Sequence, residues 1–336
     1  MATGVSGPAR PLVLVCAAGT LLLVASLSIS VGARSIPLGE VWALLLQPDG
    51  SDAAAVVHDL RLPRTLLGVL AGAALGVAGA LMQALTRNPL ADPGLLGVNA
   101  GAALAMVIAF LTLGIDGAGG QLWFAFAGAA LAATAVYAIG GAARGGPTPI
   151  RMVLAGAAVS AALLALVQGA VLLNPVALDR FRFWAVGALA GRESGVVSAV
   201  AIPILAGLAL ALPLGRVLNV IALGEGVSAA LGAGLARARI ATVVAVTLLC
   251  GAATAAAGPI AFLGLAVPHL ARALLGPDQR WVLPASMLLA PTLLLAADVV
   301  GRLVDRPAEI QVAVVCAFFG APVLIAVARR PRAVAA

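Results

Sequence analysis

Long apolar runs, separated by short polar stretches, dominate the sequence from residue 11 onward. A helix needs roughly 20 predominantly apolar residues to cross a bilayer. We therefore predict spans at 11–33, 64–86, 94–113, 122–142, 152–173, 195–213, 281–300 and 308–328. The run 240–275 is apolar throughout but is interrupted by Gly258-Pro259, so it contains either one span plus a re-entrant piece or two short helices. We take it as two helices, 240–257 and 260–275, which gives ten spans.

The longest interruption with polar character is 214–239. Its glycines make it too broken to span, whereas Val227, Ala230 and Leu231 fall on one face at helical spacing. A short helix from Glu225 to Leu231, ended by Gly232, fits the usual start and stop signals. The segment is either an amphipathic connector on the membrane surface or a cytosolic docking element for a partner.

Two other interruptions, 34–63 and 174–194, are predicted to lie on the opposite side of the membrane from 214–239. Each combines a short amphipathic stretch with arginines, and the second carries Trp184 near a predicted span end. Tryptophans at such positions are typical of the membrane interface. We therefore expect short interfacial helices in both segments.

The composition is that of a membrane protein with many spans. Hydrophobic residues make up 62% of the chain, charged residues 10%, and the mean hydropathy is +1.13. All 20 basic residues are arginine, and a chain without lysine cannot supply a standard Walker A nucleotide site. Cys16, Cys250 and Cys316 each lie in an apolar run, so we expect small buried hydrophobic side chains without a disulfide or metal site.

Arginine placement tests the count of ten. With a cytosolic N-terminus, ten spans place twelve arginines and three acidic residues inside, and eight arginines and ten acidic residues outside. This distribution agrees with the general rule that the cytosolic loops of membrane proteins carry an excess of basic residues. Nine spans would place Arg329, Arg330 and Arg332 outside. We therefore expect both termini in the cytosol and a first span that is retained rather than cleaved as a signal peptide.

Candidate chemistry is sparse. No catalytic group or metal-ligand spacing is found, so we expect no catalytic residues, metal or cofactor. His269 fits a hydrogen-bonded structural role better than a ligand role. Asp298 is the one carboxylate within a predicted span, which is weak support for ion coupling. Gly68, Gly72 and Gly76 form a stripe of small residues, which allows helices to approach closely.

Several blocks of sequence resemble the permease subunits of bacterial ATP-binding-cassette (ABC) importers for iron-siderophores, haem and cobalamin. They are RLPRTLLGVLAGAALGVAGALMQALTRNPLADPGLLGVNAGA (61–102), ALGEGVSAALG (222–232), GPIAFLGLAVPHLARALLGPDQRWVLP (258–284), and AADVVGR (296–302) followed by Glu309 and FGAP (319–322). Their order and spacing cover nearly the whole chain. The resemblance implies an all-α, ten-helix, cobalamin-permease-like fold in one transmembrane domain, 1–336, of the type II importer class.

The resemblance also implies partners and site residues. The partners are two cytosolic ABC ATPases, a second permease copy or paralogue, an external binding protein and membrane lipids, without nucleic acid. The ATPase-coupling loop would comprise Ala222, Leu223, Gly224, Glu225, Ala229, Leu231 and Gly232. The cytosolic gate would include Thr148 and Pro149. Arg61, Arg64 and Arg302 would dock the binding protein, the alternative being contacts with lipid phosphates or with Asp59 and Asp305.

The function that follows is import of an iron-siderophore across the bacterial cytoplasmic membrane, with haem and cobalamin as open alternatives. ATP hydrolysis would reside on another chain. Two other classes stay open from the residues alone. One is an ion-coupled secondary transporter with inverted repeats, and the other is a structural membrane scaffold.

Overall fold

The computed structural model describes residues 9–32, 35–113, 118–142, 148–224, 234–305 and 308–328, and within these ranges the regular structure is entirely helical. This confirms the all-α prediction. The helices are α1 (Arg10–Ser30), α2 (Leu38–Leu46), α3 (Asp52–Ala55), α4 (Leu62–Thr86), α5 (Val98–Leu113), α6 (Ala118–Gly141), α7 (Pro149–Leu173), α8 (Pro175–Ala185), α9 (Ser194–Ala211), α10 (Gly215–Ala222), α12 (Leu235–Ala257), α13 (Leu263–Leu275), α14 (Gln279–Val304) and α15 (Val312–Ala328). Short 3-10 turns at Pro93–Leu96 and Leu212–Leu214 precede α5 and α10.

Seven helices of the described chain are long and apolar enough to cross a membrane, and three apolar helices are shorter. The shorter ones are Val98–Thr112, Leu263–Leu275 and Val312–Pro322. All ten predicted runs therefore contain a helix, although three fall below the usual spanning length. The start of the second run is further upstream than predicted, because α3 and a π-helical turn, Val56–Arg61, continue directly into α4.

The apolar run 240–275 folds as two separate helices. Helix α12 ends at Ala257, where Gly258 adopts φ 76°, a left-handed conformation that glycine tolerates best. Helix α13 then begins at Leu263, three residues later than predicted. The interruption at Gly258-Pro259 is thus confirmed.

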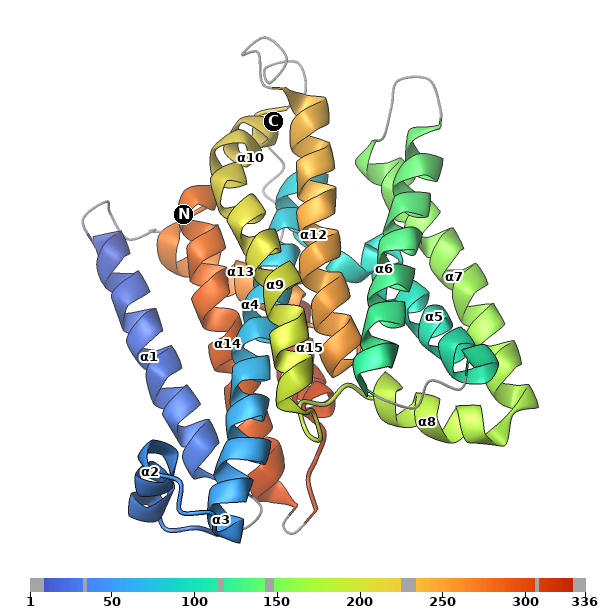
Figure 1. Cartoon of the computed structure of the whole chain (residues 1–336). Coiled ribbons are helices and arrows are strands. Elements are labelled where there is room, and N and C mark those ends of the chain that lie inside the picture. Colours follow the sequence, from blue (N-terminus) through green and yellow to red (C-terminus); the bar gives the residue numbers. More distant parts are fainter. Residues whose placement is uncertain are drawn as a thin grey trace.

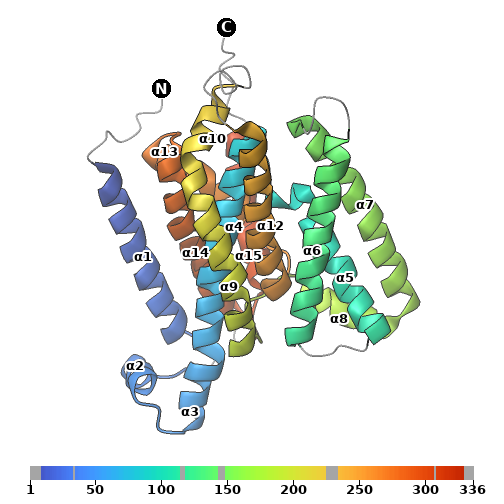
Figure 2. The same ribbon diagram turned by 45° about the horizontal axis from the view of Figure 1, so that its top comes forward.

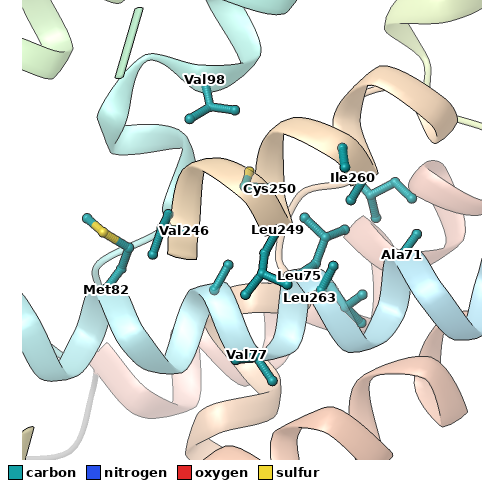
Figure 3. Packing of buried hydrophobic residues seen from close by; sticks show 14 of the residues in the cluster. Ala71, Leu75, Val77, Met82, Val98, Val246, Leu249, Cys250, Ile260 and Leu263 are labelled. Carbon is teal, nitrogen blue, oxygen red and sulfur yellow. The ribbon is translucent and has the colours of Figure 1, made fainter. Parts of the chain in front are cut away.

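Helix α4 lies at the centre of the bundle and packs against α9, α12, α13 and α14. Most of its side chains are buried, and Figure 3 shows Leu75 and Met82 of α4 beside Leu249 and Val246 of α12. On another face, Gly72 lies against Pro291 and Gly76 against Ala290, both on α14. A Cβ atom on either glycine would overlap these neighbours, so the small-residue stripe is structural, as predicted.

The short helices divide between the two ends of the bundle. Helices α2, α3 and α8 lie at one end, and α10 lies at the other (Figures 1 and 2). Segments 34–63 and 174–194 are therefore on the opposite end from the start of segment 214–239, as the sequence predicts. We call the end with α2, α3 and α8 the outer end and the other the inner end, in keeping with that prediction.

The cysteines follow the prediction only in part. Cys250 and Cys316 are buried, but Cys16 is exposed. The prediction for Cys16 was wrong because α1 lies on the edge of the bundle (Figure 1), where apolar residues such as Leu22 and Leu23 are exposed. An apolar environment in the sequence does not distinguish a side chain in the protein core from one that faces lipid.

Candidate functional site

Four charged side chains meet near the outer end, and we call them the ionic cluster: Arg64, Asp298, Arg302 and Glu309. Arg64 lies in the first turn of α4, and Asp298 and Arg302 are one turn apart on α14. The Arg64 Nη2 is 2.8 Å from the Asp298 Oδ1, and the Arg302 Nη2 is 2.8 Å from the Asp298 Oδ2. The Arg64 Nη1 is 2.7 Å from the Glu309 Oε2, which links α4 to the segment before α15.

The cluster is balanced in charge, and its centre is buried. Its two arginines and two carboxylates sum to zero, and the side chains of Asp298 and Arg302 are only 1% and 2% exposed. Isolated charges at such depth would be costly, whereas a paired and hydrogen-bonded set is tolerated. Removing one member leaves another buried charge without its partner. The cluster therefore fixes α4, α14 and the approach to α15 relative to one another.

Arginines also hold the C-terminal end of α1. The Arg302 Nη1 donates to the carbonyls of Ser28 and Val31 at 2.8 and 2.6 Å, and the Arg61 Nη1 donates to those of Ile29 and Ser30 at 3.1 and 2.8 Å. The last carbonyls of a helix have no partner within it and carry partial negative charge. The two guanidinium groups therefore satisfy the end of α1 and tie it to α4 and α14.

The three predicted docking residues are thus part of the internal structure. Arg61 and Arg302 are 4% and 1% exposed. Arg64 pairs with Asp298 and Glu309, so the predicted alternative partners Asp59 and Asp305 do not pair with it. Docking by these arginines stays a prediction, and Arg61 or Arg302 would have to leave the α1 carbonyls to take part.

A cavity of about 680 Å³ adjoins the ionic cluster. Volumes between about 300 and 1,000 Å³ are typical of small-molecule sites. Its walls come from α4, α5, α6, α8, α14, the start of α15 and the segment between α8 and α9. The lining residues are Arg64, Met106, Val107, Phe110, Gln121, Ala177, Phe181, Trp184, Ala188, Leu189, Ala190, Gly191, Arg192, Asp298, Glu309, Ile310, Gln311 and Val312.

The segment 186–193 forms one wall of the cavity and is fixed by its backbone. Gly187 and Gly191 adopt φ 75° and 68°, which allows the chain to turn twice between α8 and α9. The Ala188 amide donates to the Ala257 carbonyl at 2.8 Å, and the Ala313 amide donates to the Gly187 carbonyl at 3.4 Å. The wall is therefore attached to the end of α12 and the start of α15.

Three polar atoms on cavity-lining residues are buried without a hydrogen-bond partner in the described structure: the Arg192 Nε, the Trp184 Nε1 and the Gln311 Oε1. Burial lowers the pKa of Arg192, and no carboxylate offsets this effect. The sequence did not indicate these three residues as a group. Trp184 and Arg192 lie close together around the turns that follow α8, whereas Gln311 lies far along the chain, just before α15, and the predicted interfacial role of Trp184 does not fit its 7% exposure.

At the inner end, the structure describes only the first residues of the predicted coupling loop, at the C-terminal end of α10. Helix α10 ends at Ala222, and Leu223 and Gly224 come next, with Gly224 at φ 103°. Glu225, Ala229, Leu231 and Gly232 lie outside the described residues, as does the predicted short helix. The coupling role of the loop stays a prediction.

Helix α10 is attached to the start of α14 by a polar contact. The Asn219 Nδ2 donates to the Asp278 Oδ1 at 2.6 Å, and the Gln279 amide donates to the Asn219 Oδ1 at 2.8 Å. Asp278 also caps α14 by accepting from the Arg280 amide. Hydrogen bonds from Arg280 and Asn219 lower the pKa of Asp278 to about 2.

The predicted gate residues lie at the start of α7. Thr148 is the N-cap, and its Oγ1 accepts from the Arg151 amide at 3.4 Å, while Pro149 is the first helical residue. Proline is favoured there because its missing amide is not needed. These contacts explain the residue types through helix capping, and the gate role stays a prediction.

His269, which was singled out from the sequence, and other polar residues of the bundle have structural partners. The His269 Nδ1 is 2.8 Å from the Leu265 carbonyl, which confirms the hydrogen-bonded structural interpretation. The Thr254 Oγ1 donates to the Asn99 Oδ1 at 2.9 Å and links α12 to α5. Within the described residues no group of His, Cys, Asp or Glu could hold a metal ion.

Comparison with known proteins gives one consistent result. The FecCD transport family model matches residues 20–330. The ferric enterobactin transport system permease protein of Escherichia coli K12 is 49% identical over 310 residues, 92% of each chain. The iron(3+)-hydroxamate import system permease protein of Bacillus subtilis 168 is 40% identical over 323 residues, 96% of this chain and 84% of the relative. A metal-chelate type ABC transporter solved in an inward-facing conformation has a TM-score of 0.84 at 27% identity, covering 95% of this chain and 99% of the other.

Proposed function

The chain belongs to the FecCD transport family, which includes permease subunits of iron-chelate, hemin and vitamin B12 ABC importers, and from this premise we propose that it imports a ferric siderophore. The observation that carries the proposal is the family match over residues 20–330, together with 49% identity to a ferric enterobactin permease along nearly the full length. Haem and cobalamin are the competing substrates within the same family.

We propose the ten-span arrangement for the membrane-embedded part, with 1–336 as one permease domain. The three short apolar helices, Val98–Thr112, Leu263–Leu275 and Val312–Pro322, would complete the set begun by the seven longer ones. The positive-inside distribution supports placing both termini and 214–239 in the cytosol of the bacterial cell. The outer end, with α2, α3, α8 and the cavity, would then face the binding protein.

The cavity supports a role as the outer part of the translocation path. It lies beside α8 and the start of α15 at the end where an external binding protein would release its ligand. A second permease copy would supply the facing wall of a shared path. We propose that docking uses this outer face, with the buried Arg61 and Arg302 holding the α1 end in place beneath it.

The inner end supports the coupling proposal. Two cytosolic ABC ATPases would engage the segment that follows α10, including Glu225, Ala229, Leu231 and Gly232. Movement of that segment would pass to α14 through Asn219 and Asp278. Helix α14 runs from this contact to Asp298, a rise of about 30 Å at 1.5 Å per residue. One continuous helix would thus connect the coupling end with the ionic cluster at the cavity.

The test is reconstitution of the permease with its ATPase and binding protein in proteoliposomes. We expect uptake of a ⁵⁵Fe-siderophore that requires ATP and the binding protein and is insensitive to uncouplers. Preference for haem or cobalamin over every ferric siderophore tested would correct the substrate. Uncoupler-sensitive uptake without ATP would instead favour an ion-coupled secondary transporter.

A further inference from the structure

Arg192 lines the cavity but does not belong to the ionic cluster. The cluster sums to zero, so the cluster and Arg192 together carry one net positive charge. The described structure shows no acidic partner for Arg192, in contrast to Arg64 with its two carboxylates. A partly buried guanidinium group without a partner carboxylate can bind an anion through charge-assisted hydrogen bonds.

The neighbouring wall has further unmet hydrogen-bonding capacity. The Nε of Arg192 and the Nε1 of Trp184 are donors without acceptors, and the Oε1 of Gln311 is an acceptor without a donor, all buried on residues that line the same cavity. Trp184 is 7% exposed, so water does not readily satisfy it from outside. An unmet buried polar group lowers the stability of the fold. Because these atoms are covered, an occupant would reach them after small rotations of the side chains toward the cavity, and an oxygen-rich occupant would then satisfy all three.

The alternative explanation is a structural arginine that supports the segment 186–193. That segment is already fixed by the backbone contacts of Gly187 and Ala188 with α15 and α12. Within the described residues, the Arg192 side chain makes no hydrogen bond that contributes to it, and none of its donors holds a carbonyl as those of Arg61 and Arg302 do. The segment therefore does not depend on the Arg192 charge for its shape.

We propose that Arg192, with Trp184 and Gln311, forms an anion subsite in the cavity that selects negatively charged, oxygen-rich metal chelates over neutral ones. The subsite rests on the proposed function, because it specifies the substrate class for that same path. The guanidinium group would donate to oxyanions at the chelate surface, and Trp184 would add a donor beside an apolar ring face. Gln311 would accept a hydrogen bond from an amide or hydroxyl of the chelate.

The test compares two ferric chelates of similar size that differ in charge. Three catecholate dianions on Fe³⁺ give a net charge of −3, and three hydroxamate monoanions give zero. Equilibrium binding of each ⁵⁵Fe-labelled chelate is measured on the full-length permease in lipid nanodiscs without the binding protein. Wild-type protein should bind the tris-catecholate more tightly than the tris-hydroxamate.

Arg192→Gln removes the charge and keeps much of the side-chain volume. It should weaken tris-catecholate binding at least about tenfold, because hydrogen bonds to charged groups contribute about 1.5–3 kcal/mol. Binding of the neutral tris-hydroxamate should change less than twofold, which also shows that the variant is folded. Trp184→Phe, which keeps a ring and loses the N–H, should weaken tris-catecholate binding severalfold.

Arg182→Gln is the matched control. Arg182 lies on α8 at the same end, is 62% exposed, pairs with Asp179 at 3.3 Å and does not line the cavity. Its substitution should leave both affinities unchanged. An equal effect of Arg182→Gln would mean that general surface charge, not the cavity, attracts the chelate, and it would overturn the proposal.

Other outcomes also overturn the subsite. They are equal losses for both chelates in Arg192→Gln, no binding of either chelate to wild-type permease at 1 mM, or weakened docking of the ligand-free binding protein with chelate affinity unchanged. The last would assign Arg192 to a carboxylate of the docking protein. ATP-driven ⁵⁵Fe uptake by the complete importer is measured in parallel. Uptake that persists while the subsite test fails leaves the proposed function intact, and absence of uptake of any ferric chelate by the wild type refutes the function itself.

Discussion

Replacing Asp298 with asparagine is the sharpest test of the ionic cluster. The substitution keeps the shape of the side chain and removes the negative charge between Arg64 and Arg302, whose nitrogens lie 2.8 Å from its two oxygens. Unit charges about 4 Å apart attract by about 4 kcal/mol at an effective dielectric constant of 20, so two such pairs contribute about 8 kcal/mol. Dehydration of the buried charges offsets several kcal/mol of this.

The net cost of removing Asp298 is nevertheless large, because two guanidinium groups then remain with Glu309 as the one carboxylate of the cluster. Breaking a buried ion pair by removing one partner costs about 3–5 kcal/mol. We expect the apparent Tm of the purified permease in detergent to fall on the order of 5–15 °C. Asp305→Asn is the control, since Asp305 lies just after α14 but is exposed, and it should change the Tm by no more than about 2 °C.

A double-mutant cycle separates the charge pair from general destabilisation. Arg64→Gln and Asp298→Asn should each destabilise the protein, and the double variant should lose clearly less than the sum of the two. Coupling of about 1–3 kcal/mol is expected for residues in one network. If Asp298→Asn behaves like Asp305→Asn, or if the two cluster substitutions are additive, the pairs are no stronger than exposed ones, which contribute about 0.2–1 kcal/mol.

Four further expectations follow from the packing, the helix caps and the proposed topology. Gly76→Leu should destabilise the bundle by roughly 1–3 kcal/mol or more, because the added side chain overlaps α14, and an unchanged Tm would contradict the close contact. Asp278→Ala should remove a helix cap worth about 0.5–2 kcal/mol. Because the pKa of Asp278 is lowered to about 2, its contribution should be fully present above about pH 4 and lost as the pH falls toward 2, so a Tm difference between wild type and Asp278→Ala that varied between pH 5 and 8 would argue against it. Gly232→Trp should abolish ligand-stimulated ATP hydrolysis by the complete importer while the protein still inserts in the membrane, whereas normal coupled hydrolysis would favour the membrane-surface connector. Single cysteines at Ser51 and Ser228 in a cysteine-free background should react with an impermeant reagent from opposite sides, and labelling from the same side would refute the ten-span topology.

The sequence by itself determined the helical framework and the family. Spans of apolar residues are a local property, because a helix satisfies its own backbone and needs only sufficient length and hydrophobicity. The break at Gly258-Pro259 is equally local, since one glycine with positive φ ends α12. The glycine stripe around Gly72 likewise predicts a close contact with another helix, but it does not indicate which helix.

Only the tertiary structure decided what the charged residues do. Arg64 and Asp298 are 234 residues apart in the chain, so no local pattern distinguishes an arginine that pairs within the bundle from one that faces a docking protein. Arg61 and Arg302 looked like surface cations because they flank predicted spans, yet the end of α1 folds against them and uses their donors. Whether a charged side chain is buried, and which group it pairs with, depends on which helices pack side by side. That packing is a property of the complete bundle.

The residues that line the cavity also show the difference between what the sequence indicates and what the folded structure decides. Trp184 near a span end was interpreted as an interfacial residue, and Arg192 and Gln311 carried no signal at all. Their common property is three unmet polar atoms beside one cavity, which exists only after α8, the segment 186–193 and the start of α15 have come together. A sequence specifies which atoms are polar, but whether such an atom has found a partner is a property of the folded arrangement.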